Sequence, residues 1–200
     1  MDDLALDGRQ LGKRGAATRR RLLDATTLLL ETHGIRDLRV VDIAREVGTS
    51  PATFYQYFRD VEEAVLILAA EVGEETAPLL QLLTGDWQGP AGLQKARQLV
   101  DDFIVFWDAH RAVLRTRNLG AQEGDQRFRS VRNSSLRPLT EGLARLVPPG
   151  DLSPIAAASA LVAMMERMAA FHVDLEPLGA SRSDVVETVA QIVHRTVTAS

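Results

Sequence analysis

Apolar residues recur along this chain at steps of three and four positions, which is the spacing of an amphipathic α-helix. Clear series of this kind lie in residues 61–72, 93–107 and 185–192. No segment alternates apolar and polar residues at every second position, as a half-buried β-strand would, and no repeat of fixed length occurs. The pattern therefore predicts an all-α protein.

Glycine, proline and short polar residues divide the periodic segments into about nine helices. Gly34 ends the first helix and Pro51 begins a short one. Asp60 and Glu63 have the spacing of a capping box at the start of a long fourth helix, which Pro78 is expected to kink or interrupt. Further helices are predicted over about 92–110, 112–119, 125–147, 153–174 and 181–198.

The composition, 46% apolar and 25% charged, is that of a globular chain rather than a disordered one. The absence of cysteine excludes disulfide scaffolds, thiolate zinc sites and cysteine nucleophiles. The longest nearly apolar run, Ile155–Met165, has 11 residues, whereas a transmembrane helix needs roughly 20. The first residues have neither the basic nor the apolar part of a signal peptide. We expect a soluble, cytoplasmic protein with no membrane partner.

Positive charge is concentrated near the N-terminus, although the net charge is −4. Residues 8–23 contain six basic groups and no acidic group. Residues 1–60 carry ten basic and nine acidic groups, and the remaining 140 residues carry thirteen and eighteen. This distribution describes a short basic arm on an acidic body. Such an arm is either a solvated tail or a segment that contacts nucleic acid.

Residues 42–58 contain the pattern that carries the most information about function. A short helix over 42–48 ends in a glycine, and a second short helix begins at Pro51. Two short helices joined by a glycine-containing turn describe a helix-turn-helix, whose second helix enters the major groove of DNA. Phe54 and Phe58 supply the apolar face of that helix. Its other face carries groups suited to phosphate oxygens and base edges, namely Thr53, Tyr55, Gln56 and Tyr57.

The stretch from Asp42-Ile43-Ala44 through Gly48-Thr49-Ser50-Pro51 to Phe58 resembles the N-terminal motif of TetR-family transcriptional regulators, with similarity over residues 17–68. The resemblance implies an all-α homodimer that represses a promoter until a small molecule binds. It also implies a palindromic operator and no cofactor. We therefore expect a flexible basic arm over 1–14, a helix-turn-helix domain over 15–60, and a ligand-binding and dimerisation domain over 61–200.

The family motif implies a role for individual residues of this segment. By resemblance, the residues that hold phosphates are Thr49, Ser50, Tyr55 and Tyr57, and those that approach bases are Pro51, Thr53 and Gln56. Core packing is the alternative role of Tyr55. The run Arg19–Arg21 is expected to form a partly solvated helix face with one or two phosphate contacts.

Two positions depart from the family pattern. Arg39 stands where a serine or threonine usually caps the second helix, so we expect Asp37 to provide the cap and Arg39 to reach a phosphate. Val61 stands where a lysine often contacts the DNA backbone. Lys13 and Arg14 are expected to compensate for that missing contact.

Bulky apolar side chains gather at helical spacing in the second half of the chain. They are Val100, Phe103 and Trp107 on one predicted helix and Met164, Met165 and Met168 on another. Periodicity alone does not distinguish an ordinary core from a ligand pocket, although thioethers adapt to varied ligand shapes. The family resemblance favours an apolar pocket between the two helices.

A narrower resemblance, to the actinobacterial ethionamide-resistance repressor, rests on residues 103–113 and on Met165-Glu166-Arg167. It implies that Val100, Phe103, Trp107 and Met165 line an apolar tunnel, with Phe128 near its mouth. Met165 stands where that repressor has an asparagine, so lipid-like, acyl or aromatic effectors are favoured over sugars or nucleotides. The last two helices carry apolar residues on two sides, and in the family the corresponding pair forms the dimer interface.

Catalytic motifs are absent from the sequence. It contains none of the His-Glu-x-x-His, Gly-x-Ser-x-Gly or Gly-x-Gly-x-x-Gly patterns. The acidic pairs Asp101-Asp102 and Glu74-Glu75 are adjacent, so on a helix each pair diverges by about 100°. We therefore expect no enzyme and no metal site. The remaining alternative is a helical small-molecule-binding protein that does not bind DNA sequence-specifically.

Overall fold

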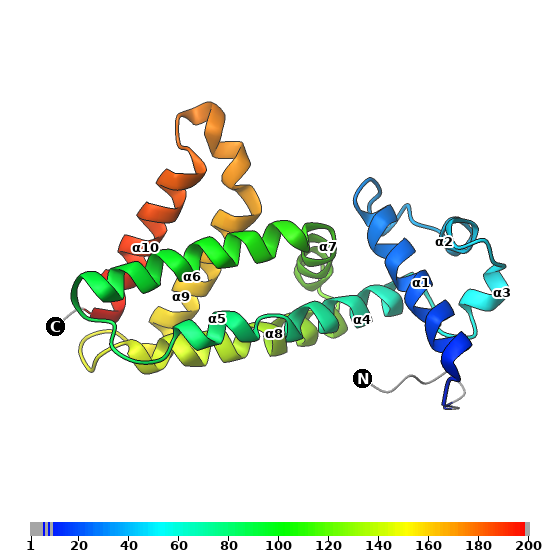
Figure 1. The fold of residues 1–200 in the computed structure, drawn as a ribbon, viewed down its shortest axis with the longest axis horizontal. Helices are drawn as coiled ribbons and strands as arrows, with labels where there is room; N and C mark the ends of the chain where they lie inside the picture. Colours follow the sequence, from blue (N-terminus) through cyan, green and yellow to red (C-terminus); the bar gives the residue numbers. More distant parts are fainter. Residues whose placement is uncertain (1–5, 7, 9, 199–200) are drawn as a thin grey trace. The chain divides into compact units, whose positions relative to one another are not determined.

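The computed structural model describes residues 6, 8 and 10–198, and this part of the chain contains ten α-helices and one 3-10 helix (Figure 1). The prediction of an all-α fold is confirmed. The helices are α1 Lys13–Leu30, α2 Val40–Glu46, α3 Pro51–Phe54, α4 Val61–Glu74, α5 Ala77–Leu82, α6 Gly89–Ala109, α7 Arg111–Gln122, α8 Gln126–Leu146, α9 Pro154–Phe171, η1 His172–Leu178 and α10 Arg182–Thr198.

Two prolines that the sequence places inside helices have different effects. Pro78 lies in the first turn of α5, so the predicted long fourth helix is interrupted between Glu74 and Ala77. A proline is tolerated there because the first-turn N–H groups of a helix have no partner within the helix. Pro138 lies inside α8, which nevertheless continues to Leu146. The predicted long fourth helix is therefore the two helices α4 and α5, whereas α8 has nearly its predicted length.

The chain forms two compact units. The first consists of the residues up to Val72 together with Ala112–Arg132, so it contains α1–α3, most of α4, nearly all of α7 and the start of α8. The second consists of Gly73–Arg111 and the residues from Asn133 onward. Each unit has its own core of fully buried side chains. Phe54 and Phe58 belong to the first core, and Phe103 and Met165 belong to the second.

The second unit is organised around α6. Both α9 and α10 pack against α6, and these two helices run antiparallel to each other, joined by η1 (Figure 1). At the start of α6, Gly92 packs directly on the preceding loop, where an added Cβ would lie 1.6 Å from the carbonyl oxygen of Trp87. The second unit therefore depends on a close backbone approach at one end of its central helix.

One helical stretch among the described residues, Pro154–Leu178, is long and apolar enough to cross a membrane, as judged by length and composition alone. The sequence predicts no membrane-spanning helix, because its longest nearly apolar run has 11 residues. Core helices of soluble proteins meet the same criterion, and α9 packs against α6 with buried residues such as Leu161 and Met165. This single helix therefore does not indicate a membrane protein.

A polar pair joins α6 to α10. Arg97 donates to Glu187 at 2.7 Å from Nε and 3.1 Å from Nη2, and Gln191 donates to the same carboxylate at 2.9 Å. The hydrogen bond from Arg97, followed by that from Gln191, lowers the pKa of Glu187 from 4.5 to about 2. A carboxylate with a depressed folded-state pKa contributes stability above its ordinary pKa and loses that contribution as the pH falls toward the folded value. The contribution is therefore present above pH 4.5 and disappears toward pH 2.

We expect Arg97→Ala to raise the pKa of Glu187 most of the way back to its ordinary value, because the substitution removes the strongest hydrogen bond to the carboxylate. NMR titration of the Glu187 carboxyl carbon measures this directly. Asp184 is the internal control, since hydrogen bonds from Ser181 keep its pKa low independently of Arg97. An unchanged Glu187 titration in the variant would show that the pair does not form in solution.

Candidate nucleic-acid interface

The predicted helix-turn-helix is present, and its turn is held by backbone hydrogen bonds. The N–H groups of Val47, Gly48 and Thr49 donate to carbonyls of α2 at 3.3, 3.0 and 2.8 Å. Gly48 has φ of +70°, in the left-handed region that only glycine adopts without strain. The chain therefore turns sharply at Gly48, and two residues, Thr49 and Ser50, separate that glycine from the start of α3.

Ser50 and Pro51 begin α3 as their residue types predict. The Ser50 Oγ accepts the backbone N–H of Thr53 at 3.3 Å and lies 3.1 Å from the Thr53 hydroxyl. Pro51 occupies the first turn, where its missing N–H costs no hydrogen bond. On the inner side, Phe54 and Phe58 are both fully buried, with ring centroids 5.1 Å apart. These two rings fix which face of the segment is turned outward.

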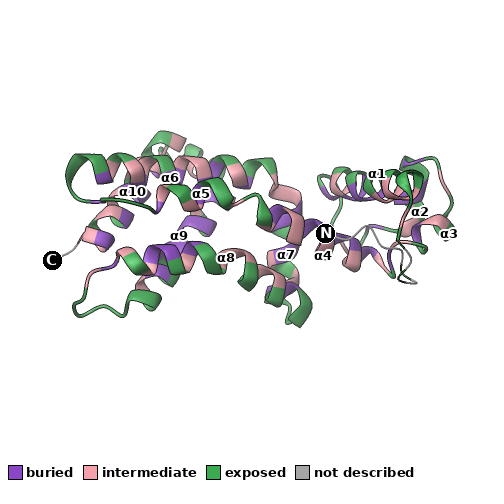
Figure 2. Cartoon of the chain, turned by 60° about the horizontal axis from the view of Figure 1, so that its bottom comes forward, coloured by how far each residue is buried: buried purple, intermediate pink, exposed green. Residues whose placement is uncertain are grey.

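The outward face carries the residues predicted to contact DNA (Figure 2). The exposed ones are Ser50, Pro51, Tyr55 and Gln56, and the half-buried ones are Thr49, Thr53 and Tyr57. Tyr55 is 52% exposed and touches Phe54 edge-on, at a centroid distance of 5.8 Å. Core packing is therefore not the role of Tyr55. The turn and α3 present a contiguous set of hydroxyl and amide groups, which can donate to phosphates and read base edges.

The expected cap of α2 by Asp37 is wrong. Arg39 is the N-cap residue and makes no side-chain capping bond, while the backbone N–H of Asp37 donates to Gly34 within the preceding turn. The guanidinium groups of Arg39 and Arg45 both bond Asp42, at 3.0 and 3.3 Å. The acidic group near the start of α2 is therefore Asp42, which lies within the helix. Arg39 remains three-quarters exposed and pairs with Asp42 at the surface, where such a pair is weak.

Lys13 and Arg14 form the first turn of α1 and are exposed. Among the described residues, neither side chain has a hydrogen bond or ion pair. Much of the predicted arm, including Arg9, lies outside the described residues. One described arm residue, Leu6, donates its backbone N–H to the Gln56 carbonyl at 3.1 Å. Leu6 therefore lies next to the segment that presents Gln56.

The capping box at the start of α4 forms with a shifted partner. Asp60 Oδ1 accepts the N–H of Glu63 at 2.7 Å, as predicted. The Glu63 carboxylate, however, accepts the backbone N–H and the guanidinium of Arg59 rather than the N–H of Asp60. Partial burial is the largest single influence on the pKa of Glu63, and it raises that pKa. The hydrogen bonds and charge of Arg59 together outweigh burial, so the pKa of Glu63 lies below its ordinary value. Arg59 directly follows the segment that presents the predicted DNA contacts, residues 49–58, which we call the reading segment. Its bonds to Glu63 thereby attach the end of the reading segment to α4.

We expect Gly48→Ala to destabilise the first unit by about 1–2 kcal/mol, because a left-handed conformation at a residue with a Cβ costs roughly that amount. Nothing lies within 4 Å of an added Cβ at Gly48, so the cost is conformational and not steric. Gly48→Asn is the matched variant, since asparagine tolerates left-handed backbone. Thermal unfolding of both variants checks this, and equal losses of stability for alanine and asparagine would contradict it.

The residues predicted to bind a ligand divide between the two units. Val100, Phe103 and Trp107 are buried on α6, which packs against α9. On α9, Met165 is buried, and Met164 and Met168 are half-buried. Phe128 belongs to the first unit, where its ring packs on Gly120. The α6 and α9 residues therefore belong to one unit, in which the two helices pack against each other, and Phe128 belongs to the other unit.

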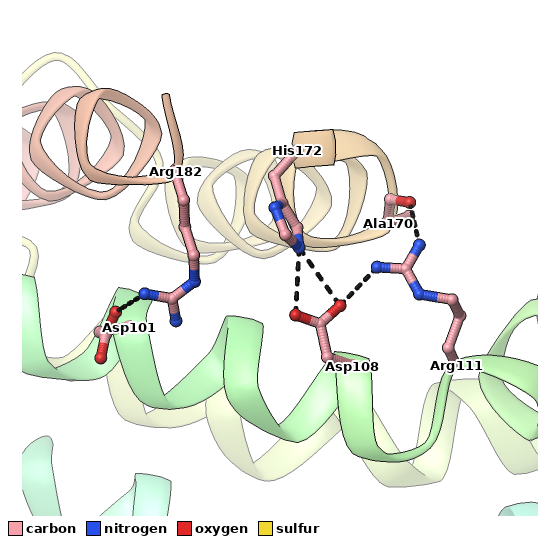
Figure 3. A network of polar contacts seen from close by, with 6 residues as sticks. All are labelled: Asp101, Asp108, Arg111, Ala170, His172 and Arg182. Carbon is pink, nitrogen blue, oxygen red and sulfur yellow. Dashed lines mark hydrogen bonds and ion pairs between the residues drawn. The ribbon is translucent and has the colours of Figure 1, made fainter. Parts of the chain in front are cut away.

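A polar network that the sequence analysis did not predict fastens the α9–α10 connection to α6 (Figure 3). His172 Nε2 lies 3.1 and 3.2 Å from the two carboxylate oxygens of Asp108, which also bonds Arg111. Arg111 donates to the Ala170 carbonyl at 3.0 Å, and Arg182 donates to Asp101 at 2.6 Å. The available signal was the seven-residue spacing of Asp101 and Asp108, which places both on one face of a helix.

Comparison with protein-family models matches both halves of the chain. The model of the C-terminal domain of tetracyclin-repressor-like proteins matches residues 79–200. The model of bacterial regulatory proteins of the tetR family matches residues 22–65, which include the whole helix-turn-helix. No curated protein sequence matches the chain. Regulators of this family bind operator DNA and small-molecule ligands, typically as dimers, and they are not enzymes.

Solved structures share the fold at low sequence identity. A TetR-family regulator from Streptomyces coelicolor is 17% identical, with a TM-score of 0.68 over 93% of this chain and 80% of that chain. The fatty acid degradation regulator FadR from Bacillus halodurans is 17% identical, with a TM-score of 0.66 over 96% and 98%. FadR from Bacillus subtilis, solved in complex with stearoyl-CoA, is 14% identical, with a TM-score of 0.66 over 90% and 97%. From the family-model matches, with the fold in agreement, this chain belongs to the TetR family of transcriptional regulators.

Proposed function

We propose that this chain is a cytoplasmic repressor that binds a palindromic operator as a homodimer and is released by an apolar small molecule. The observation that carries the proposal is the outward face of the turn and α3, on which hydroxyl and amide groups gather over two buried phenylalanine rings. In this proposal the phosphate contacts come from Lys13, Arg14, Arg39, Thr49, Ser50, Tyr55 and Tyr57. The base contacts come from Pro51, Thr53 and Gln56.

The apolar layer between α6 and α9 supports an apolar effector. Val100, Phe103 and Trp107 contribute large apolar surfaces, and the half-buried Met164 and Met168 have side chains that adapt to a guest. The Bacillus subtilis regulator of the same fold was solved with stearoyl-CoA, a ligand with a long acyl chain. We therefore place long-chain acyl compounds first among candidate effectors. The narrower resemblance to the ethionamide-resistance repressor stays a prediction.

The hairpin of α9 and α10 supports a homodimer. Several of its apolar side chains are exposed in the single chain, including Ile155, Phe171 and Ile192. A second copy of the same hairpin would cover them and form a four-helix bundle. A two-fold dimer presents two identical reading heads, and DNA recognition requires them to lie about 34–36 Å apart, one helical turn of the duplex.

Release would follow from coupling between the two halves of the chain. The helix α4 begins beside the reading segment and continues past Val72, where the chain passes from the first unit to the second. An effector that changes the tilt of α4 changes the separation of the heads. Because linkage is reciprocal, operator DNA and effector must weaken each other's binding by the same factor.

The test is binding to the DNA directly upstream of the protein's own gene at two salt concentrations, followed by addition of stearoyl-CoA, whose acyl chain is apolar, and of a panel of apolar compounds. We expect specific binding that weakens with salt, because phosphate contacts release counterions, and loss of binding with an active effector. A panel of apolar compounds that binds the protein without changing its DNA affinity would overturn the ligand-responsive part of the proposal. Binding of ligand with no sequence preference for DNA would favour the alternative of a helical small-molecule-binding protein.

A further inference from the structure

Three consecutive arginines, Arg19–Arg21, lie in α1 and are the last basic residues of the basic run. The sequence predicts a partly solvated face with one or two phosphate contacts. In the structure, each of the three guanidinium groups contacts a different part of the first unit. The three arginines therefore have three different environments, although they are adjacent in the sequence.

Arg21 bonds the turn of the helix-turn-helix. Its Nη2 donates to the Val47 carbonyl oxygen at 2.6 Å. Val47 is the residue directly before Gly48, whose left-handed conformation turns the chain. The N–H groups of the turn are used by α2 carbonyls, and the carbonyl of Val47 is held from outside by α1. The turn is therefore fixed on both its donor and its acceptor side.

The two neighbouring arginines also bind their own chain. The guanidinium of Arg19 lies 5.5 Å from the centroid of the Phe58 ring, within the range of a cation–π contact. Arg20 bonds Asp24 at 2.8 Å and Glu71 of α4 at 2.6 Å. Lys13 and Arg14, one to two turns earlier on α1, have no partner among the described residues, although they are exposed like Arg20 and Arg21. The basic run thus has an earlier part without partners and a later part whose guanidinium groups bind the first unit.

We infer that Arg21 is a positioning residue for DNA recognition: it holds the turn that presents Thr49 and Ser50, and it does not itself bind a phosphate. The inference rests on the proposed DNA binding. The 2.6 Å bond to the Val47 carbonyl holds one of the five N–H donors of the guanidinium and fixes the orientation of the group against the turn. Without it, the turn can shift relative to α1, and the reading face loses its fixed geometry. Phosphate binding by the basic run falls instead to Lys13 and Arg14.

The salt dependence of DNA binding separates a positioning role from a phosphate contact. Each lost phosphate contact reduces the slope of log Kobs against log salt concentration by about 0.9. Loss of a positioning residue leaves that slope unchanged but lowers the preference for operator over random duplex. Loss of a hydrogen bond to a charged group corresponds to a factor of about 10 or more in an equilibrium constant, here the ratio of operator affinity to random-duplex affinity.

The experiment measures fluorescence anisotropy of full-length Arg21→Ala, Arg21→Lys and Lys13→Ala, with operator and random duplexes at four salt concentrations. Circular dichroism at the assay temperature confirms that each variant is folded. We expect Arg21→Ala to lose about 10-fold or more of its operator preference at an unchanged slope. Arg21→Lys should recover part of the preference, because an ammonium can still donate to the carbonyl. Lys13→Ala should reduce the magnitude of the salt slope by about 0.9 and weaken binding to both duplexes by the same factor.

A reduced slope for Arg21→Ala would show a phosphate contact and overturn the inference. Unchanged affinity and slope in a folded variant would also overturn it, by showing that Arg21 affects stability alone. Failure of the proposed function is distinguishable, because the wild-type protein itself would then show no preference between the two duplexes.

Discussion

Replacing Gln56 and Tyr57 together by alanine is expected to remove the preference for operator DNA, with a loss of about 100-fold in the ratio of specific to non-specific affinity. Gln56 is exposed at the end of the reading segment, and its amide can pair with adenine through two hydrogen bonds, which is worth about 1–3 kcal/mol of discrimination. Tyr57 is half-buried beside Phe58 and adds a phosphate contact that fixes the register.

The two single substitutions should differ in how their effects depend on the DNA sequence. Gln56→Ala alone is expected to relax the preference at one base position without changing the salt slope, whereas Tyr57→Ala alone weakens binding to all sequences alike. Gln122→Ala is the matched control, because Gln122 is an exposed glutamine of the same unit on α7. Titration of operator and random duplexes with each variant measures the effects. A double variant with wild-type operator preference would show that the reading face is misassigned.

Gly92→Ala is expected to destabilise the second unit severely, by more than about 3 kcal/mol, because the new methyl group cannot be accommodated by a side-chain movement. The atoms in its way are the carbonyl oxygen, carbonyl carbon and Cα of Trp87, at 1.6, 2.1 and 2.7 Å. These are backbone atoms, and the Trp87 carbonyl also accepts a hydrogen bond from His194 of α10 at 3.1 Å. A shift of the loop would therefore disturb the end of α10 as well.

Thermal and denaturant unfolding of Gly92→Ala measures this loss. Gly150→Ala is the control, since nothing lies within 4 Å of an added Cβ at that position and its φ is not in the left-handed region. The control should unfold close to the wild type. A Gly92→Ala protein of wild-type stability would mean that the loop before α6 does not pack as described.

The sequence was sufficient to predict the helix-turn-helix, because the constraints on it are local. A left-handed turn requires Gly48, a first-turn proline marks the start of α3, and two phenylalanines four residues apart define one buried face. Each requirement acts within a few residues, so spacing alone reveals it. The all-α class follows in the same way, from helical periodicity in every long segment.

Contacts between distant segments could not be predicted from spacing. The residues Ala112–Arg132 belong to the first unit although 39 residues of the second unit, Gly73–Arg111, separate them from Val72. Phe128, predicted near the mouth of the pocket, belongs to this first unit, and the predicted pocket residues of α6 belong to the second. The exposed Arg21 bonds a carbonyl 26 positions away, that of Val47. The residue type alone favoured solvent or phosphate.

The two shifted caps have a physical cause in competition among neighbouring polar groups. Asp37 is positioned by the turn that begins at Gly34, which leaves α2 without a side-chain cap. At α4, the guanidinium of Arg59 adds charge-assisted bonds that draw the Glu63 carboxylate away from the Asp60 N–H. At α4 the sequence pattern identified the helix start and the bond to Asp60, but not the partner of the Glu63 carboxylate. The helix predicted over 42–48 begins at Val40, two residues earlier, and ends at Glu46.

Selection from a pool of random duplex DNA with the purified full-length protein tests the central claim most directly. The proposed homodimer, which has two identical helix-turn-helix heads, should enrich an inverted repeat whose half-site centres lie about 34–36 Å apart, equivalent to one turn of the duplex. Enrichment should disappear for the protein carrying both Gln56→Ala and Tyr57→Ala. A pool that remains random after selection with the wild-type protein would contradict sequence-specific DNA recognition by this chain.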